Sequence, residues 1–290
     1  MLMKNICISC IMGVIMLTTC CCSEEGEIKS ASLSWIDKGT PVDVLPANNQ
    51  IGEDWQLAFS DEFNGEAVDF NKWTILDQYR GAVTKHGIKE WYFKPENVAV
   101  SNGNLILKNT KVGTDIMNCA SVYSNKKYFM KYGYAEARVK IADTNAGALT
   151  AFWLQSNTMS NVDGTGNDGA EIDIFESAYV TDEMITTIHI DGYAEDHQQK
   201  SYRYVTPGIF DGYHTWGCLW DENSVKIYYD GKLTAEFDGT WIPQVEEFLY
   251  LSTVATFGEK AFFKDRQPDS WLSEACFDYV RVWTNSKKQK

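Results

Sequence analysis

The segment "NDGAEIDIFESAY", residues 167–179, places Glu171, Asp173 and Glu176 within six positions of an otherwise apolar run. Acidic side chains are rarely fully buried unless they are paired, so three carboxylates in such a run need an explanation. Side chains alternate between the two faces of a strand, which puts Glu171 and Asp173 on one face and Ile172 on the other. Glu176 is out of phase, but a β-bulge near residues 174–175 would return it to the carboxylate face.

The spacing of the two glutamates predicts a particular chemistry. With a bulge, their Cα atoms would stand about 13 Å apart, and inward-leaning side chains would bring the carboxyl groups to about 5–6 Å. Retaining glycosidases need about 5–5.5 Å, with one glutamate attacking the anomeric carbon and the other acting as acid and then base. An aspartate between them can orient the nucleophile. A solvated face and a metal cage are the alternatives, and this pattern alone leaves catalysis and a structural role both open.

Outward from this segment, short apolar runs alternate with Gly-, Asn- and Asp-rich turns over residues 54–284. Asn102-Gly103 and Asp230-Gly231 each separate two alternating apolar segments, which is the strongest short hairpin pattern. No long segment has the 3.6-residue period of a helix. The chain is therefore predicted to be all-β, an antiparallel β-sandwich of the jelly-roll kind.

The composition of the chain restricts the class of partner that it can bind. The chain has 290 residues with 44% hydrophobic and 13% aromatic content, enough for a substantial core. Its net charge of −14 argues against nucleic acid and favours a neutral partner. Beyond the N-terminal segment the cysteines are Cys119, Cys218 and Cys276, an odd set without a C-x-x-C pair, which predicts packing residues rather than a disulfide framework or a zinc site.

The N-terminus has the pattern of a targeting segment. Lys4 precedes "ICISCIMGVIML", residues 6–17, an apolar run too short to span a bilayer. "LTTCCCSEEGE", residues 17–27, resembles the lipobox of bacterial lipoproteins, with Cys20, Cys21 or Cys22 as the lipidated residue. The acidic residues that follow resemble a surface-export signal of Bacteroidetes lipoproteins. This implies a protein on the outer membrane, exposed at the cell surface and touching the membrane only through its lipid; an ordinary cleaved signal, with a periplasmic or secreted product, is the alternative.

We accordingly divide the chain into a signal and lipidation segment, a flexible tether, a folded domain and a short tail. Their ranges are residues 1–22, 23–53, 54–284 and 285–290.

A resemblance to a known family adds to this interpretation. "EIDIFE", residues 171–176, matches the E-[IL]-D-[IVAF]-[VILMF]-E pattern of glycoside hydrolase family 16 in its bulged, laminarinase- and lichenase-like form. Further segments look like family segments in family order, among them "LAFSDEFNG" (57–65), "YGYAEARVKI" (132–141) and "FDYVRVW" (277–283). The resemblance implies a concanavalin A-like jelly roll with a concave substrate cleft. It also implies Glu171 as nucleophile, Asp173 as assisting residue, Glu176 as acid/base, and endo-acting retaining hydrolysis without a catalytic cofactor.

Aromatic rings can cover the apolar face of a sugar, so tryptophans and tyrosines are candidate substrate contacts. Trp153 matches a tryptophan of the family cleft, and His189 would lie on the strand beside the carboxylates. Three further candidates are Trp216, Trp91 and Tyr193. The resemblance also implies a structural calcium, for which the matching positions are Glu62, Gly103 and Asp278; a buried hydrogen-bond network is the alternative there.

The substrate expected first is a neutral β-1,3- or mixed-linkage β-1,3-1,4-glucan, bound by a monomer. Phe175 stands where laminarinase-like members commonly have Met, so a second expectation is an endo-β-galactosidase acting on galactan or on mucin-type poly-N-acetyllactosamine. A surface glycan-binding protein without activity is the alternative from another class. Its usual mark would be loss of a catalytic glutamate, and both are present.

Overall fold

The computed structural model describes residues 35–47, 54–261, 268 and 271–285. The predicted signal and lipidation segment, including Cys20, Cys21 and Cys22, lies outside the described residues, as do tail residues 286–290. Within the described part of the chain, no helix is long and apolar enough to cross a membrane. The described residues all belong to one compact unit, Ser34–Lys290.

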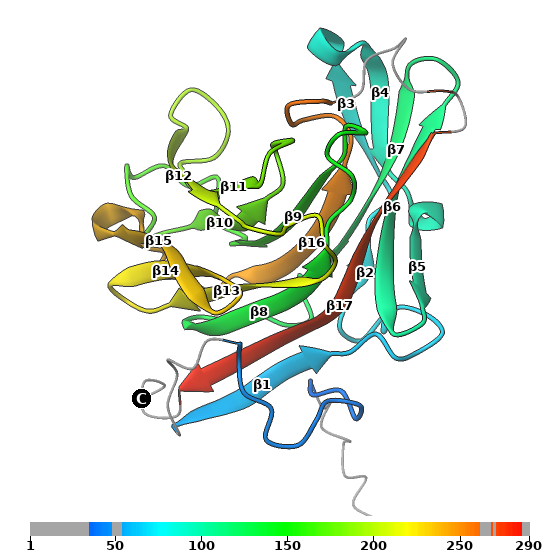
Figure 1. The fold of residues 1–290 in the computed structure, drawn as a ribbon. Coiled ribbons are helices and arrows are strands. Elements are labelled where there is room, and N and C mark those ends of the chain that lie inside the picture. The colour runs from blue at the N-terminus through cyan, green and yellow to red at the C-terminus, as the bar shows by residue number, and fades with distance from the viewer. Residues whose placement is uncertain (1–34, 48–53, 262–267, 269–270, 286–290) are drawn as a thin grey trace, which may run out of the picture. The chain divides into compact units, whose positions relative to one another are not determined.

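The fold is almost entirely β, as predicted, and its strands form two sheets that share β7 (Ile116–Tyr123) (Figure 1). We call the sheet that carries the three carboxylates the site sheet. Its strands run in the order β2 (Thr74–Ile75), β7, β16 (Phe248–Val254), β9 (Leu149–Gln155), β10 (Ala170–Glu176), β11 (Glu183–Ile190) and β12 (Gln198–Val205). All of these pairings are antiparallel.

The second sheet, called the back sheet, is organised around the long strand β17 (Leu272–Asn285). Its other strands are β1 (Trp55–Asp61), β3 (Gln78–Val83), β4 (Ile88–Phe93), β5 (Val98–Ser101), β6 (Asn104–Val112), β8 (Gly133–Lys140), β13 (His214–Trp220), β14 (Ser224–Tyr229) and β15 (Lys232–Asp238). Three short 3-10 helices are η1 (Thr84–His86), η2 (Pro95–Asn97) and η3 (Gly239–Trp241). One pairing departs from the predicted antiparallel pattern, because β4 runs parallel to β7.

Both predicted hairpins are confirmed. Asn102 and Gly103 have φ values of 52° and 70°, and Asp230 and Gly231 have 45° and 74°. Positive φ at both central residues defines the two-residue turn whose twist matches that of the flanking strands, which explains the Asn-Gly and Asp-Gly pairs. The turns join β5 to β6 and β14 to β15.

The core lies between the two sheets, and it contains Trp216. Phe175 on β10 stacks on Trp216 of β13 with ring centroids 4.1 Å apart, and both side chains are fully buried. Trp216, Cys218 and Trp220 alternate along β13 and share its inward face. The prediction that Trp216 binds substrate is therefore wrong, because its ring cannot reach a sugar from the core.

The predicted tether, residues 23–53, is corrected over the part that the structure describes. The Trp35 carbonyl accepts a hydrogen bond from the Ser60 amide at 3.0 Å. Farther along, the Ala47 amide donates to Glu136 Oε2 at 2.9 Å, and the Trp283 indole donates to the Val44 carbonyl at 3.1 Å. Residues 35–47 thus belong to the folded domain, since polar and proline-rich composition does not reveal backbone contacts to distant strands.

The predicted calcium ligands do not fit a calcium ion. Arg281 Nε and Nη2 donate to the two carboxylate oxygens of Glu62 at 2.8 and 2.7 Å, and Arg138 Nη1 donates to Asp278 Oδ2 at 2.7 Å. A cation site needs carboxylate oxygens that face the ion, and here a guanidinium occupies each carboxylate. Gly103 lies in the turn between β5 and β6. The alternative, a buried polar network around Glu62, is what the structure contains.

Candidate active site

A bulge in β10 aligns the three carboxylates. Asp173 pairs with Thr187 on β11, yet Glu176, three residues on, pairs with Ile185, only two residues from Thr187. The register also shifts against β9, between Asp173 and Phe175. One extra residue on β10 therefore brings Glu176 back toward the side of Asp173, whose negative charge acts on it. This is the bulge that the alternation of residues 171–176 predicts.

Glu171 is buried but receives hydrogen bonds that favour its ionised form. Gln155 Nε2 donates to Glu171 Oε2 at 2.6 Å, and the Tyr193 side chain also hydrogen-bonds to Glu171. Burial raises the pKa of Glu171 to about 8, and the charge of Asp173 adds to this effect, whereas the Tyr193 bond and the charge of His189 lower the pKa. Tyr193, a predicted substrate contact, lies beside this carboxylate with 60% of its surface exposed.

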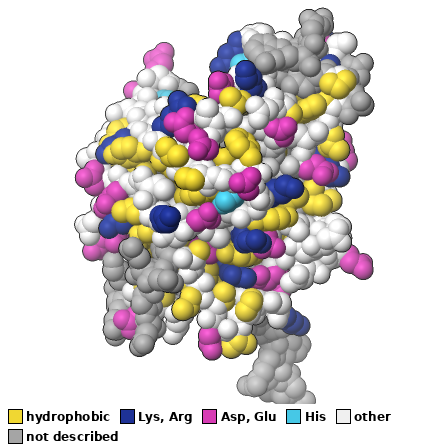
Figure 2. All heavy atoms as spheres, in the orientation of Figure 1, with side chains coloured by type: hydrophobic (Ala, Val, Ile, Leu, Met, Phe, Trp, Pro, Cys, Tyr) yellow, Lys and Arg dark blue, Asp and Glu magenta, His cyan; other side chains and the backbone are white. Residues whose placement is uncertain are grey.

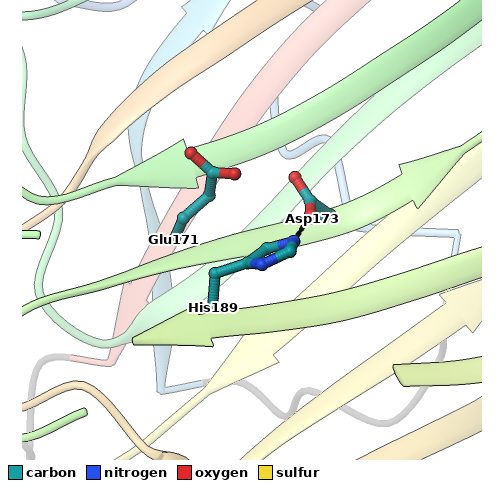
Figure 3. A group of neighbouring side chains, drawn as sticks. All are labelled: Glu171, Asp173 and His189. Carbon is teal, nitrogen blue, oxygen red and sulfur yellow. Dashed lines mark ion pairs between the residues drawn. The ribbon is translucent and has the colours of Figure 1, made fainter. Parts of the chain in front are cut away.

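Asp173 begins a chain of polar contacts that leads through two histidines. Its Oδ2 lies 3.1 Å from His189 Nε2 on β11, an ion pair drawn as a dashed line in Figure 3. His189 Nδ1 in turn lies 2.8 Å from His197 Nε2. Burial raises the pKa of Asp173. The placement of His189 beside the carboxylates agrees with the sequence expectation, whereas His197 was not identified from the sequence.

Glu176 has a different environment from Glu171. Burial raises the pKa of Glu176 to about 8, with the charge of Asp173 adding to the effect and His189 opposing it. Among the side chains that the structure describes, none donates a hydrogen bond to Glu176. A carboxyl group that is desolvated and lacks donors retains its proton, whereas donors aimed at Glu171 stabilise a carboxylate. Burial raises the pKa of both glutamates to about 8, so the difference between them lies in their hydrogen bonds, which favour the carboxylate on Glu171.

One group of side chains also has the spacing of a metal site. Single donor atoms of Glu171, Asp173 and His189 all lie within 4.8 Å of one another. Each of these side chains already has protein partners, namely Gln155 and Tyr193 for Glu171, and His189 for Asp173. We therefore assign the group to proton transfer and orientation.

Aromatic rings extend from the carboxylates across the site sheet. Trp153 on β9 pairs with Asp173 on one side and with Tyr250 on β16 on the other. Its ring stacks on Tyr250 with centroids 3.8 Å apart and an interplanar angle of 1°, and Tyr250 stacks in turn on Tyr123 of β7 at 5.2 Å. Trp153 is half-buried. It keeps its predicted position next to the carboxylates, while Tyr250 was not recognised from the sequence as a site residue.

A hollow lies along this row of rings. Its volume is about 510 Å³, and its lining includes Tyr123, Tyr250, Gln155 and Tyr193. Because Gln155 and Tyr193 also contact Glu171, the hollow adjoins that carboxylate. The lining also includes uncharged polar residues such as Asn125 and Asn157, and one acidic residue, Asp77. A mixture of rings and uncharged polar groups is typical of a surface that binds sugars.

Trp91, another predicted substrate contact, is not available to a sugar. Its ring is only 4% exposed and packs edge-on against Phe93 and Phe257, with centroids at 5.3 and 5.8 Å. The Arg80 guanidinium lies over it at 5.4 Å from the ring centroid. The prediction for Trp91 is wrong because β4 directs its side chain into a second buried apolar cluster, which also contains Phe93 and Met117.

Glu247 is a buried acid close to the site that the sequence did not single out. It is fully buried ahead of β16, and within the described part of the chain neither carboxyl oxygen has a hydrogen-bond partner. Burial raises its pKa well above the usual value, and the charges of Glu171 and Asp173 add to this effect. Glu247 therefore folds as a neutral acid.

Glu247→Gln should stabilise the protein increasingly as pH rises. The unfolded acid loses its proton near pH 4.5, the ordinary value for a glutamate, whereas the folded acid keeps it, so unfolding releases a proton and wild-type stability falls above that pH. The amide removes this penalty. Urea unfolding at pH 4 and pH 8 should show a gain that is larger at pH 8, and the exposed Glu66→Gln should show none. An equal gain at both pH values would contradict the buried neutral acid.

Comparisons with known proteins identify the family of this chain. The family model described as "Beta-porphyranase A-D, GH16 domain" matches residues 55–285. β-Porphyranase E of Zobellia galactanivorans is 29% identical over 257 residues, covering 78% of this chain and 86% of that protein. Glucan endo-1,3-β-glucosidase A1 of Niallia circulans is 28% identical over 86% of this chain, which spans only 40% of its length.

Solved structures show the same fold. The laminarinase catalytic domain of Thermotoga maritima is 27% identical with a TM-score of 0.62, covering 80% of this chain and 99% of that one. By sequence, β-porphyranase B of Phocaeicola plebeius is a further relative, 28% identical over 60% of this chain and 64% of its own length. The family model covers nearly the whole described domain, so this chain belongs to glycoside hydrolase family 16.

Proposed function

We propose that this chain is an endo-acting β-glycanase that hydrolyses internal β-linkages with retention of configuration. The observation that carries the proposal is the contrast between the two glutamates on one face of β10. Burial raises the pKa of both glutamates to about 8, and the hydrogen bonds that Glu171 receives from Gln155 and Tyr193 favour the carboxylate on that residue. The double-displacement reaction requires one carboxylate and one protonated acid, and this difference in donors suits Glu171 to the first role and Glu176 to the second.

The proposed reaction has two steps. Glu171 attacks the anomeric carbon while Glu176 gives its proton to the departing glycosidic oxygen, which leaves a sugar esterified to Glu171. Glu176, now a carboxylate, then takes a proton from water, and that water attacks the same carbon and releases Glu171. Asp173 orients the nucleophile through its charge and its ion-pair contact with His189. Two inversions give overall retention.

A β-1,3- or mixed-linkage β-1,3-1,4-glucan is the substrate proposed first. Trp153, Tyr250 and Tyr123 form a stacked row of rings beside the carboxylates. The adjoining hollow is lined by Tyr250, Tyr123 and mostly uncharged polar groups. An open row that crosses several strands suits cleavage within a chain rather than at its end. The names of the glucan endo-1,3-β-glucosidase and laminarinase relatives support this choice.

A galactan is the second candidate, which the family model and the porphyranase relatives favour. Arg80 on β3 is exposed, and its guanidinium lies 5.4 and 5.5 Å from the ring centroids of Trp91 and Phe93. Its charge also reaches Tyr250, one of the rings along the hollow. A cation there would suit an anionic substituent on the substrate. Over the face of the molecule that Figure 2 shows, acidic and basic side chains are interspersed.

A substrate panel tests the proposal. Laminarin, barley glucan, agarose, porphyran and mucin are incubated with the enzyme, and released oligosaccharides are separated by chromatography. We expect a ladder of medium-length products from laminarin or barley glucan early in the reaction, because internal cleavage precedes single sugars. Products from galactans or mucin alone would select the second candidate. Binding without any product would show a glycan-binding protein and contradict the proposed activity.

We further propose that the mature protein is lipid-anchored at the outer membrane and exposed at the cell surface, as a monomer. The support is the apolar run ahead of Cys20, Cys21 and Cys22. Wild-type protein should partition into membranes and take up a fatty-acid probe, and replacing all three cysteines with serine should release it. Soluble, unlabelled wild-type protein would contradict the anchor.

A further inference from the structure

The chain of polar contacts from Asp173 through His189 to His197 runs from the interior toward solvent. The Asp173 side chain is 7% exposed and that of His189 is 15% exposed, while His197, on the loop between β11 and β12, is half-buried. The two contacts measure 3.1 Å from Asp173 to His189 and 2.8 Å between the histidines. The planes of the two imidazole rings are nearly parallel, with an interplanar angle of 15°. This geometry joins a buried carboxylate to a partly accessible imidazole.

The proton positions along this chain depend on one another. When Asp173 is a carboxylate and His189 is neutral and donates from Nε2, His189 Nδ1 accepts a hydrogen bond from His197 Nε2. His197 then carries its proton on Nε2 and has an unprotonated Nδ1. A partner that donates to the second nitrogen of His189 thereby selects the tautomer that supports Asp173.

The same chain can carry a proton. If His197 Nδ1 takes up a proton, its Nε2 proton can pass to His189 Nδ1, and the His189 Nε2 proton can pass to Asp173. One proton enters at His197 and one arrives at Asp173, with both histidines neutral before and after. The titratable groups around the chain are Glu171 and Glu176 on β10, Tyr193 on the β11–β12 loop and Glu247 ahead of β16.

Resting on the proposed glycosidase function, we propose that His197 is a positioning residue: through His189 it holds Asp173 as a hydrogen-bond acceptor and gives that buried carboxylate a proton route to solvent. The role matters because the charge of Asp173 acts on both glutamates. A neutral Asp173 would weaken the tendency of Glu176 to keep its proton and would no longer accept the His189 bond. His197 touches neither glutamate in this scheme and acts through His189 and Asp173.

Three variants test the role of His197. His197→Phe keeps a ring beside Tyr193 without a nitrogen, His197→Gln keeps a hydrogen-bond donor without a proton relay, and His197→Gly leaves a space for added imidazole. The acid limb of the kcat/KM profile should move to higher pH in His197→Phe and His197→Gly by about half to one unit, a roughly 3- to 10-fold loss of rate on that limb. His197→Gln should lose less, and millimolar imidazole should restore His197→Gly but not change wild type. His86→Gln, a histidine change away from the site, should leave the profile unchanged.

Two outcomes would overturn the proposal. One is an unchanged pH profile in His197→Phe, and the other is a loss that is uniform with pH and is not restored by imidazole. A readout without substrate separates this proposal from the proposed function: ¹⁵N NMR of the imidazole rings should show His189 protonated on Nε2 in wild type and a mixed tautomer in His197→Phe. If wild type cleaves no polysaccharide, the proposed function is wrong. If His189 has the same tautomer in wild type and in His197→Phe, the inference about His197 is wrong as well.

Discussion

Glu171→Ala is expected to lower kcat/KM on polysaccharide by about 10⁴- to 10⁶-fold, because no glycosyl-enzyme can form without the attacking carboxylate. Alanine also leaves a space on the face from which Glu171 attacks. Azide can enter that space and displace an activated leaving group directly, with a single inversion. Glu171→Ala with azide and an activated aryl β-glycoside should therefore give the α-glycosyl azide, identified by NMR.

The matched control for this variant is Glu195→Ala, which removes an exposed carboxylate from the loop after β11. It should retain wild-type activity. Substantial hydrolysis by purified Glu171→Ala, or a β-glycosyl azide from it, would show that Glu171 is not the nucleophile. Circular dichroism of both variants should match wild type, so that loss of activity reports chemistry and not unfolding.

Glu176→Ala is expected to slow polysaccharide hydrolysis by about 10²- to 10⁴-fold but to spare the first step with activated aryl glycosides. Such leaving groups depart without a proton, so the intermediate on Glu171 still forms. The second step then lacks a base for water. Azide needs no base, so it should restore turnover and give the β-glycosyl azide after two inversions.

The kinetic sign of the Glu176→Ala variant is a burst of released aryl alcohol followed by slow turnover. Its pH profile should also lose the alkaline limb, since the raised pKa of Glu176, about 8, marks the loss of the acid's proton in wild type. An alkaline limb that survives the substitution, or an α-glycosyl azide product, would reverse the roles assigned to the two glutamates.

Much of the fold was predictable because each part of it has a local cause. The Asn-Gly and Asp-Gly pairs predict hairpins through their tolerance of positive φ, and alternation along residues 171–176 predicts both the shared carboxylate face and the bulge. Residues 35–47 were not predictable in the same way. Their attachment depends on backbone hydrogen bonds to Ser60, Glu136 and Trp283, which leave no local pattern.

The site was predictable at its centre and less so around it. Neighbouring strands place His189 and Trp153 beside Asp173, and the family resemblance points to both. His197 and Glu247 were missed, because one lies on a loop whose path follows the β11–β12 pairing and the other has no sequence feature that marks it as buried. Aromatic content misled the predictions for Trp91 and Trp216, since a ring fits a sugar cleft and a core equally well.

The arginine partners of Glu62 and Asp278 explain why the calcium prediction was wrong. Arg281 lies far along the chain from Glu62, and Arg138 lies far from Asp278, so sequence spacing does not reveal either ion pair. A carboxylate at a family-matched position can bind a cation or an arginine, and only the packing of distant strands decides between them.

The configuration of the first sugar released by wild-type enzyme tests the central claim most directly. Proton NMR of the anomeric region, recorded within minutes of adding enzyme to a cleaved polysaccharide from the panel, distinguishes the two anomers before mutarotation mixes them. The pairing of Glu171 as nucleophile with Glu176 as acid/base predicts that the β-anomer appears first and the α-anomer follows slowly. An α-anomer that appears first would mean direct attack by water, and it would contradict the assignment of Glu171 as nucleophile.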